Sequence, residues 1–235
     1  MNKKIILAST STLFNGGYLE YLLPTLKKHF EEVKTLVFIP FARPGGISHE
    51  EYTQKVRETF NTIGINVKGL HEFDNPAEAI QNAEAIFTGG GNTFLLVSQL
   101  YNLNLMDVLK KTIENGTPYL GTSAGSNIGG LTMNTTNDMP IVLPQSFNTL
   151  GLINFNLNPH YLDPIDGSTH MGETRETRIN EFHKVSKIAV LGLREGSWLE
   201  VYGNDVILRG DLTARLFRSG EFAVEMAPNE NLNFL

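Results

Sequence analysis

The sequence predicts an α/β fold of three layers, with a largely parallel β-sheet flanked by helices on both of its faces. In the first half of the chain, short apolar runs alternate with amphipathic stretches, which is the pattern of successive strand–helix–strand units. Two of these runs end in glycine-containing turns that lead into predicted helices. In the second half, short apolar runs joined by tight turns predict antiparallel strands near the C-terminus.

Each element of the first half follows from its pattern of apolar residues. Bounded apolar runs predict strands at residues 4–9, 35–40, 66–70, 85–88 and 118–121. Leucines at helical spacing predict a helix at 17–30, and amphipathic stretches predict helices at 49–63, 76–82, 93–100 and 105–115. Helices between parallel strands cross over the sheet and cover both of its faces.

Strands dominate the second half. Apolar runs predict them at residues 152–157, 187–193, 198–202, 205–208, 213–217 and 221–224, with one helix at 173–184. Turns such as Gly203-Asn204 and Ser219-Gly220 are typical of hairpins. No internal repeat, low-complexity tract or linker interrupts the 235 residues, so one domain is expected over 1–235.

The composition excludes several classes of function. The net charge of −6 lacks the excess of positive charge that is typical of proteins that bind nucleic acid. The absence of cysteine excludes disulfides, thiolate metal sites and a cysteine nucleophile, and it suits a reducing compartment, so a cytoplasmic location is expected. The apolar run at 5–8 is shorter than a signal peptide requires, and no stretch is long enough to span a bilayer. We expect no membrane and no nucleic-acid partner.

The most informative segment is Tyr119-Leu-Gly-Thr-Ser-Ala-Gly-Ser-Asn127, which contains a Gly-x-Ser-x-Gly motif centred on Ser123. The motif lies where a predicted strand gives way to a helix. Its glycines allow a sharp turn that projects the Ser123 hydroxyl out of the sheet, close to free N–H groups at a helix start. Ser123 is therefore a candidate nucleophile. A serine- and glycine-rich turn without a ligand, or a phosphate-binding loop, stays open as an alternative.

A second glycine run, Gly89-Gly90-Gly91-Asn92-Thr93, also ends a predicted strand and precedes a helix. One interpretation is an oxyanion hole, in which the Gly91 and Ala124 N–H groups point at the carbonyl oxygen under attack. A nucleotide phosphate loop is the rival, although the run has neither the Lys-Ser/Thr of a Walker loop nor Gly-x-Gly-x-x-Gly spacing. A flexible turn is the third possibility.

A serine nucleophile requires a base, and His160 is the preferred histidine. It follows a strand-like run in Asn158-Pro159-His160-Tyr161-Leu162-Asp163-Pro164, where two prolines confine a polar loop. His170, also in a loop, is the second choice. The other histidines, which we expect to be structural or solvated, are His29, His49, His71 and His183.

The histidine requires an acid that accepts its second ring proton and stabilises the imidazolium. Glu195 follows an apolar strand and precedes a glycine, which is typical of a site residue. Asp138 lies in a turn-rich loop and is the reserve acid; its alternative role is to cap a helix or turn. The choice is close and favours Glu195.

Six segments share their residues and their order with one known family. They are Phe-Thr-Gly-Gly-Gly-Asn-Thr, Gly-Thr-Ser-Ala-Gly-Ser-Asn, Thr-Thr-Asn-Asp-Met-Pro, Asn-Pro-His-Tyr-Leu-Asp-Pro, Gly-Glu-Thr-Arg-Glu-Thr-Arg-Ile and Leu-Arg-Glu-Gly-Ser-Trp. Together they resemble the aspartyl dipeptidase, or peptidase E, family of serine peptidases. The resemblance implies a fold similar to class I glutamine amidotransferases, and so flavodoxin-like. It also implies a Ser123–His160–Glu195 triad and hydrolysis of dipeptides with an N-terminal aspartate, without a metal or cofactor.

The substrate's side-chain carboxylate requires a cation. Arg175 and Arg178 share one face of the predicted helix, and we expect Arg175 to bind the carboxylate through its planar guanidinium. Glu173 is expected to anchor that arginine or the substrate amine, and Tyr161 and Asn92 to line the pocket. A solvated helix face with Glu/Arg pairs is the alternative.

Two other functions stay open at this stage. One is a cyanophycinase-like hydrolase of β-aspartyl peptides with the same fold, and the other is a non-catalytic protein that binds an acidic metabolite. A glutamine amidotransferase is disfavoured because that chemistry uses a cysteine and the chain has none. The expected partner is a small Asp-Xaa peptide, and the expected assembly is a monomer or a homodimer.

Overall fold

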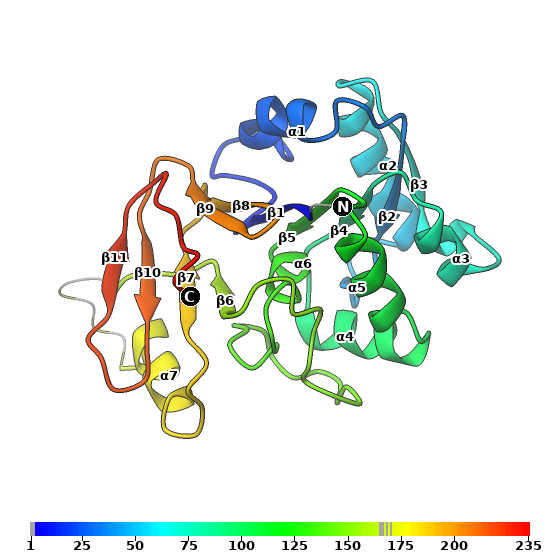
Figure 1. Ribbon diagram of the computed structural model, residues 1–235. Helices are drawn as coiled ribbons and strands as arrows, with labels where there is room; N and C mark the ends of the chain where they lie inside the picture. Colours follow the sequence, from blue (N-terminus) through cyan, green and yellow to red (C-terminus); the bar gives the residue numbers. More distant parts are fainter. Residues whose placement is uncertain (1–2, 165–166, 168, 170) are drawn as a thin grey trace.

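The computed structural model describes residues 3–164, 167, 169 and 171–235, and its elements form two sheets with surrounding helices (Figure 1). The strands are β1 (Lys4–Ala8), β2 (Thr35–Ile39), β3 (Asn66–Gly69), β4 (Ile86–Thr88), β5 (Tyr119–Thr122), β6 (Asn156–Pro159), β7 (Val190–Leu193), β8 (Trp198–Tyr202), β9 (Asp205–Arg209), β10 (Ala214–Phe217) and β11 (Val224–Met226). The helices are η1 (Glu20–Leu22), α1 (Leu23–His29), α2 (His49–Asn61), η2 (Leu70–Glu72), α3 (Pro76–Gln81), α4 (Thr93–Asn102), α5 (Met106–Glu114), α6 (Ala124–Asn127) and α7 (Arg175–Phe182).

The central sheet confirms the predicted parallel core. Within the described residues it has seven strands in the order β3-β2-β4-β5-β1-β8-β9. The strands from β3 to β1 run parallel, whereas β8 pairs antiparallel with β1 and β9 pairs antiparallel with β8. The free edge of the parallel core is therefore extended by the predicted C-terminal strands β8 and β9.

Helices cover both faces of this sheet, because alternate residues of each strand point to opposite faces. Ile6 and Phe38 pack in one hydrophobic cluster with residues of α1 and α2, whereas Ile5 and Val37 pack in a second cluster with residues of α3, α4 and α5. Figure 1 shows the same arrangement, with α1 and α2 above the sheet and α4 and α5 below it. The three predicted layers are thus present.

A second sheet is the main departure from expectation. Its described strands have the order β11-β10-β7-β6, with β6 parallel to β7 and the other pairs antiparallel. The strands β7, β10 and β11 therefore do not extend the central sheet. The chain turns between β7 and β8 at Gly196, whose φ of 92° is one that glycine adopts readily, and this corner sends β7 and β8 into different sheets.

Several predicted elements have different bounds in the structure, and three of them have a visible cause or a clear shift. The helix expected at 17–30 begins later, because Leu19 has a φ of 57° and Pro24 lies in the first turn of α1, where proline is tolerated. The strand expected at 152–157 begins at Asn156, whose side chain hydrogen-bonds Thr132. The strand expected at 221–224 lies at Val224–Met226.

Among the described residues, no helix combines the length and the apolar character needed to cross a bilayer.

Candidate active site

The candidate nucleophile and the glycine run meet at the carboxyl edge of the parallel core. Thr88, at the end of β4, is paired with Gly121 near the end of β5, so the segments that follow both strands leave the sheet side by side. A Cβ added to Gly90 would lie 2.9 Å from the Cβ of Ser123. This edge of a parallel sheet is the usual place for a ligand site in α/β folds.

The candidate base and acid meet in the second sheet for the same reason. Pro159, the last residue of β6, is paired with Leu193, the last residue of β7. His160 directly follows β6, and Glu195 follows β7 by two residues. Glu195 therefore lies directly before the turn at Gly196, where the chain passes from the second sheet to the central sheet, and its side chain contacts the histidine.

Ser123 has a strained backbone. Its φ of 52° and ψ of −110° lie outside the regions that L-residues favour, and such strain concentrates at functional sites. The flanking glycines permit the turn, because a Cβ on Gly121 would lie 2.3 Å from the Gly125 carbonyl oxygen and one on Gly125 would lie 2.1 Å from the Thr88 carbonyl oxygen. The motif glycines are thus required by close backbone approach.

The three predicted triad side chains form one hydrogen-bonded chain. The His160 Nε2 lies 2.9 Å from the Ser123 Oγ, and the His160 Nδ1 lies 2.6 Å from a Glu195 carboxylate oxygen. The imidazole can therefore accept the hydroxyl proton while the carboxylate holds the ring's other N–H. Asp138 does not take that position, and His170 lies outside the described residues.

Ser9 is a site residue that sequence reasoning missed. His160 has a φ of 55°, and its backbone N–H donates to the buried Ser9 Oγ at 2.9 Å. The same hydroxyl donates to the Leu193 carbonyl oxygen at 2.8 Å, so it joins the two strand ends that carry the base and the acid. Its sequence signal is a polar residue directly after the first apolar strand.

Two N–H groups beside Ser123 are available to a ligand. In the described part of the chain, neither the Gly91 N–H nor the Ala124 N–H makes a hydrogen bond, whereas the Gly90 N–H donates to the Tyr52 hydroxyl at 3.0 Å. Gly91 must be glycine, because its φ is 147° and a Cβ there would lie 2.2 Å from the Ala42 carbonyl oxygen. The helix after Ser123 is the single turn α6, which has only a small dipole. Negative charge that develops beside Ser123 would therefore be stabilised mainly by the two N–H groups.

Asn92 and Asp138 organise the start of α4. The Asn92 side chain accepts a hydrogen bond from the Leu95 N–H and donates to the Met139 carbonyl oxygen. The Asn92 amide thus caps the start of the helix, and its role in lining the substrate pocket stays a prediction. Asp138 Oδ2 accepts hydrogen bonds from the Thr93 N–H at 2.7 Å and from a threonine hydroxyl at 3.0 Å.

The predicted selector, Arg175, is the first residue of α7 and is half-buried. Burial lowers its pKa, the neighbouring Arg178 charge lowers it further, and the Asp138 charge opposes both effects. Arg175 forms no salt bridge within the described residues. Its guanidinium is therefore available to an anion.

The structure also places the remaining predicted substrate-binding residues. The Glu173 carboxylate lies 3.8 Å from the Arg178 guanidinium and not on Arg175, so of its two predicted roles the one toward the substrate amine stays a prediction. Tyr161 does not line the pocket, since it is 2% exposed and packs with Ile179 and Phe217 between α7 and the second sheet. The strand-end position of Tyr161 suggested exposure, but α7 covers that face.

An ion-pair network joins the segments next to the base and the acid. Arg194 binds both carboxylate oxygens of Asp163 at 2.7 Å and donates to Glu225 at 2.9 Å. Arg215 donates to Glu225 and to Glu176, each at 3.0 Å. The network thus connects three segments: the loop after His160 through Asp163, the end of β7 through Arg194, and the first turn of α7 through Glu176.

Removing the shared acceptor of this network should weaken the fold. Burial raises the pKa of Glu225, but hydrogen bonds from Arg194, Thr213 and Arg215 outweigh burial and hold it at about 2. The stabilisation is present above the unfolded pKa of about 4.3 and is lost as pH falls toward about 2. Glu225→Gln should therefore lower Tm at neutral pH, and its difference from wild type should shrink in acid, as thermal unfolding by circular dichroism would measure.

The control for this prediction is Glu221→Gln. Within the described residues, Glu221 forms a salt bridge with Arg218 alone, at 3.5 Å, and both side chains are exposed. Exposed pairs of this kind contribute little. Equal Tm losses in the two variants, or a Glu225→Gln loss that persists unchanged in acid, would contradict the network's role.

One group of potential metal ligands lies elsewhere. The ligand atoms of Glu50, His71 and Glu72 are all within 4.8 Å of one another. The Arg57 guanidinium donates to Glu50 at 3.4 Å and to Glu72 at 3.2 Å. A side-chain cation thus already contacts both carboxylates, and we assign no metal to them.

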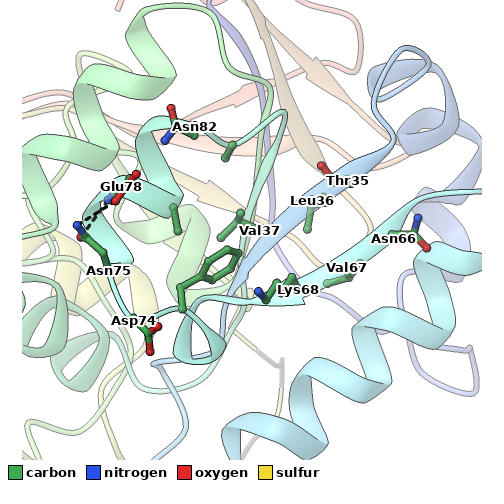
Figure 2. A pocket seen from close by; sticks show the side chains of 13 residues that line it. Thr35, Leu36, Val37, Asn66, Val67, Lys68, Asp74, Asn75, Glu78 and Asn82 are labelled. Atoms are coloured by element: carbon green, nitrogen blue, oxygen red, sulfur yellow. Dashed lines mark hydrogen bonds between the residues drawn. The ribbon is translucent and has the colours of Figure 1, made fainter.

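A hollow of about 650 Å³ lies between β2, β3 and α3 (Figure 2). Val37, Val67 and Phe73 give it an apolar lining, and Asn75 and Glu78, which hydrogen-bond each other at the start of α3, lie at its side. No residue of the Ser123 site lines it. The volume of a hollow therefore does not locate the reactive groups in this molecule.

Residues 5–209 match the sequence profile of peptidase family S51. The chain belongs to peptidase family S51. This S51 chain is 47% identical to a protein of Streptomyces coelicolor named Peptidase E, over 98% of this chain and 94% of that protein. It is 44% identical to a Drosophila melanogaster protein named Probable alpha-aspartyl dipeptidase, over 99% and 97% of the two chains.

A solved structure supports the fold of this S51 member. It is the crystal structure of a peptidase from an acI-B1 Actinobacterium, which superposes with a TM-score of 0.73 at 20% identity and covers 99% of this chain and 97% of its own. Family membership confirms the predicted resemblance and makes the protein a serine peptidase.

Proposed function

We propose that this S51 peptidase hydrolyses dipeptides whose N-terminal residue is aspartate. In this proposal Ser123 is the nucleophile, His160 the general base and Glu195 the acid that orients the histidine. The observation that carries it is the hydrogen-bonded chain from the Ser123 hydroxyl through the imidazole to the Glu195 carboxylate, at 2.9 Å and 2.6 Å. The name of the Drosophila relative supports the aspartyl substrate.

The reaction proceeds by acyl transfer in two steps. The His160 Nε2 takes the Ser123 proton while the Oγ attacks the aspartyl carbonyl carbon, and the Gly91 and Ala124 N–H groups bind the oxyanion, each contributing about 3 kcal/mol in comparable sites. The imidazolium then protonates the leaving amine, and the C–N bond breaks. Water, activated by the same imidazole, attacks the acyl-enzyme and releases aspartate.

Glu195 stabilises the imidazolium that forms in both steps. Its carboxylate accepts the Nδ1–H and fixes the tautomer in which Nε2 is the proton acceptor. The side chains of His160 and Glu195 are 38% and 47% exposed, so substrate and water reach the base directly.

Substrate choice is assigned to Arg175. A planar guanidinium binds both oxygens of a carboxylate, and this half-buried one is free of salt bridges in the described part of the chain. Partial burial strengthens its attraction for an anion, because less water competes for the charge.

We also propose a single-domain chain in the cytoplasm. One hydrophobic cluster contains residues of both sheets, such as Ile5 and Leu191, which supports one shared core. The chain has no cysteine, which suits a reducing compartment. A monomer or a homodimer is proposed for the assembly.

A dipeptide panel tests the proposed function. Purified enzyme should cleave α-Asp-Leu, and it should cleave β-Asp-Leu, Asn-Leu, Glu-Leu and Ala-Leu far more slowly, as chromatography of released leucine would measure. Preferential cleavage of β-Asp-Leu would instead assign a β-aspartyl hydrolase. An enzyme that cleaves none of these dipeptides, although it is folded, would contradict the proposal and favour a binding protein.

A further inference from the structure

The glycine loop, residues 89–91, has no side chains of its own to hold it in place. Glycine is the most flexible residue, so three in succession leave the peptide units of the loop free to rotate unless other groups fix them. The proposed reaction needs one of these units in a single orientation, with the Gly91 N–H facing the carbonyl oxygen under attack. The rigidity of the loop must therefore come from residues that pack against it.

The Tyr52 hydroxyl holds the glycine loop from the side of α2. It accepts a hydrogen bond from the Gly90 N–H at 3.0 Å and donates one to the Gly90 carbonyl oxygen at 3.4 Å. The fit is close, because a Cβ on Gly89 would lie 2.7 Å from this hydroxyl. One side chain, from a distant part of the sequence, thus occupies both polar groups of Gly90.

Tyr52 is itself firmly placed. It lies near the start of α2, which begins with a capping box formed by Ser48 and Glu51. Tyr52 is 1% exposed, and its ring packs edge-on against Phe38 of β2, with 4.9 Å between the ring centroids. The hydroxyl is therefore a fixed point, positioned by α2 and β2, to which the flexible glycine loop is anchored.

The anchored carbonyl sets the direction of the Gly91 N–H. The Gly90 C=O and the Gly91 N–H belong to one planar trans peptide, so they point in opposite directions. Because the carbonyl is directed at Tyr52, the N–H points away from Tyr52. The loop also adjoins the nucleophile, since a Cβ on Gly90 would lie 2.9 Å from the Ser123 Cβ. The Tyr52 contact thus controls a donor beside the reacting group.

The other proposed donor, the Ala124 N–H, is oriented in the same way. The Ser123 carbonyl oxygen accepts hydrogen bonds from the Ser126 N–H at 3.0 Å and from the Asn127 N–H at 2.8 Å. The Ala124 N–H belongs to the same peptide unit as that carbonyl, so it points the opposite way, out of α6. Each donor is thus fixed through the carbonyl of its own peptide unit. Backbone groups hold one of these carbonyls, and a side-chain hydroxyl holds the other.

We propose that Tyr52 is a positioning residue of the oxyanion hole, whose hydroxyl fixes the Gly90–Gly91 peptide with the Gly91 N–H toward the reacting carbonyl. The proposal rests on the proposed acyl transfer at Ser123 and deepens it. The action of Tyr52 is indirect, because its hydroxyl contacts the glycine loop and not the reacting atoms. Without this hydroxyl the peptide rotates, and the Gly91 N–H is turned away from the oxyanion for part of the time.

Tyr52→Phe tests this role, because it removes the hydroxyl and keeps the ring that packs on Phe38. For Asp-Leu, kcat should fall by about 10-fold, which is less than the roughly 100- to 1000-fold lost when an oxyanion donor is removed outright. KM should change little, since the oxyanion forms only after attack. The pH dependence of kcat should also be unchanged, because the His160–Glu195 pair is intact.

Tyr101→Phe is the matched control. The Tyr101 hydroxyl donates to the Asn148 carbonyl oxygen at 3.0 Å, so this variant also loses a hydrogen bond from a tyrosine to a carbonyl, but outside the site. Its kcat should equal that of wild type. A Tyr52→Phe enzyme with a lowered Tm but wild-type kcat would limit the hydroxyl to a role in stability and would overturn the proposal.

The boronic acid analogue of aspartate gives a readout of the oxyanion hole itself. The Ser123 Oγ bonds to the boron while its proton passes to His160, so a boron hydroxyl takes the place of the oxyanion. Tyr52→Phe should raise the Ki of this compound by about 10-fold, in line with the loss in kcat/KM. In the Ser123→Ala background, calorimetry should give the same Kd for Asp-Leu with and without Tyr52→Phe. Equal weakening of both ligands would contradict the proposal, because it would indicate damage to the whole site.

A measurement on the wild type keeps the proposal testable if Tyr52→Phe does not fold. With isotope-labelled glycine, nuclear magnetic resonance should show slow hydrogen exchange at the Gly90 amide in the free enzyme and a shift of the Gly91 amide signal when the boronic acid binds. Rapid exchange at Gly90, or an unshifted Gly91 signal, would overturn the assignment.

The outcomes separate this proposal from the proposed function. Failure of the wild type both to cleave Asp-Leu and to bind the boronic acid would overturn the proposed function, and the role of Tyr52 with it. Normal wild-type cleavage, together with an unchanged kcat in Tyr52→Phe, would overturn the Tyr52 assignment alone.

Discussion

Ser123→Ala should lower kcat for Asp-Leu by roughly 10⁴- to 10⁶-fold, because the acyl-enzyme cannot form without the hydroxyl. The measurement is leucine release under saturating substrate. KM should change far less, since the groups assigned to substrate binding remain. Ser146→Ala is the control, because the hydroxyl of Ser146 only accepts from the Asn148 N–H among the described residues.

Ser123→Gly separates the chemical role from the structural one. Glycine adopts a φ of 52° and a ψ of −110° without the steric cost that any side chain incurs there. This variant should be as inactive as Ser123→Ala and should have a higher Tm than wild type. Substantial activity in either variant would exclude Ser123 as the nucleophile.

The second large effect is expected at Arg175. Arg175→Met keeps most of the side-chain length but removes the guanidinium, so kcat/KM for Asp-Leu should fall by about 100-fold or more. The loss should be much smaller for Ala-Leu, which has no side-chain carboxylate to bind. Kinetics on both dipeptides measure the change in specificity.

Arg178→Met is the matched control for this variant. Arg178 lies one turn further along α7, is 54% exposed and pairs with Glu173 at 3.8 Å. Its replacement should change kcat/KM for Asp-Leu only a few-fold, because exposed ion pairs contribute little. Aspartyl preference that survives Arg175→Met but fails in Arg178→Met would move the selector to the second arginine.

The parallel core and the ends of its strands could be predicted from local sequence. A buried strand followed by glycines or by a polar residue is recognisable without knowledge of the fold, and this pattern singled out Ser123, Gly91, His160 and Glu195. In the structure Gly91 and Ser123 follow one pair of parallel strands, and His160 and Glu195 follow another pair in the second sheet. The hydrogen bond between Ser123 and His160 joins the two strand ends.

The second sheet could not be predicted in the same way. Its strands are recognisable as apolar runs, but their pairing joins residues far apart in the chain, such as Leu157 with Leu191. Local patterns carry no information on which sheet a strand enters. The outcome depends on the corner at Gly196, and a single glycine in a loop predicts no particular direction of the chain.

Among the predicted substrate-binding residues, Tyr161 is the one whose position differs most from expectation. Its place in a polar loop directly after His160 predicted that it lines the pocket, but α7 covers it in the structure. The capping role of Asn92 could have been predicted from sequence, because an asparagine directly before an apolar helix is a common N-cap. Ser9 and the Arg194 network depend on contacts between distant segments, so only the structure reveals them.

Trapping the acyl-enzyme tests the catalytic assignment most directly. Wild type and Ser123→Ala would be mixed with an activated aspartyl ester, quenched in acid during turnover, and digested for mass spectrometry. The predicted result is one aspartyl group on the wild-type peptide that contains Ser123 and none on the variant. An aspartyl group attached to any other residue, or undiminished turnover of the ester by Ser123→Ala, would contradict the assignment.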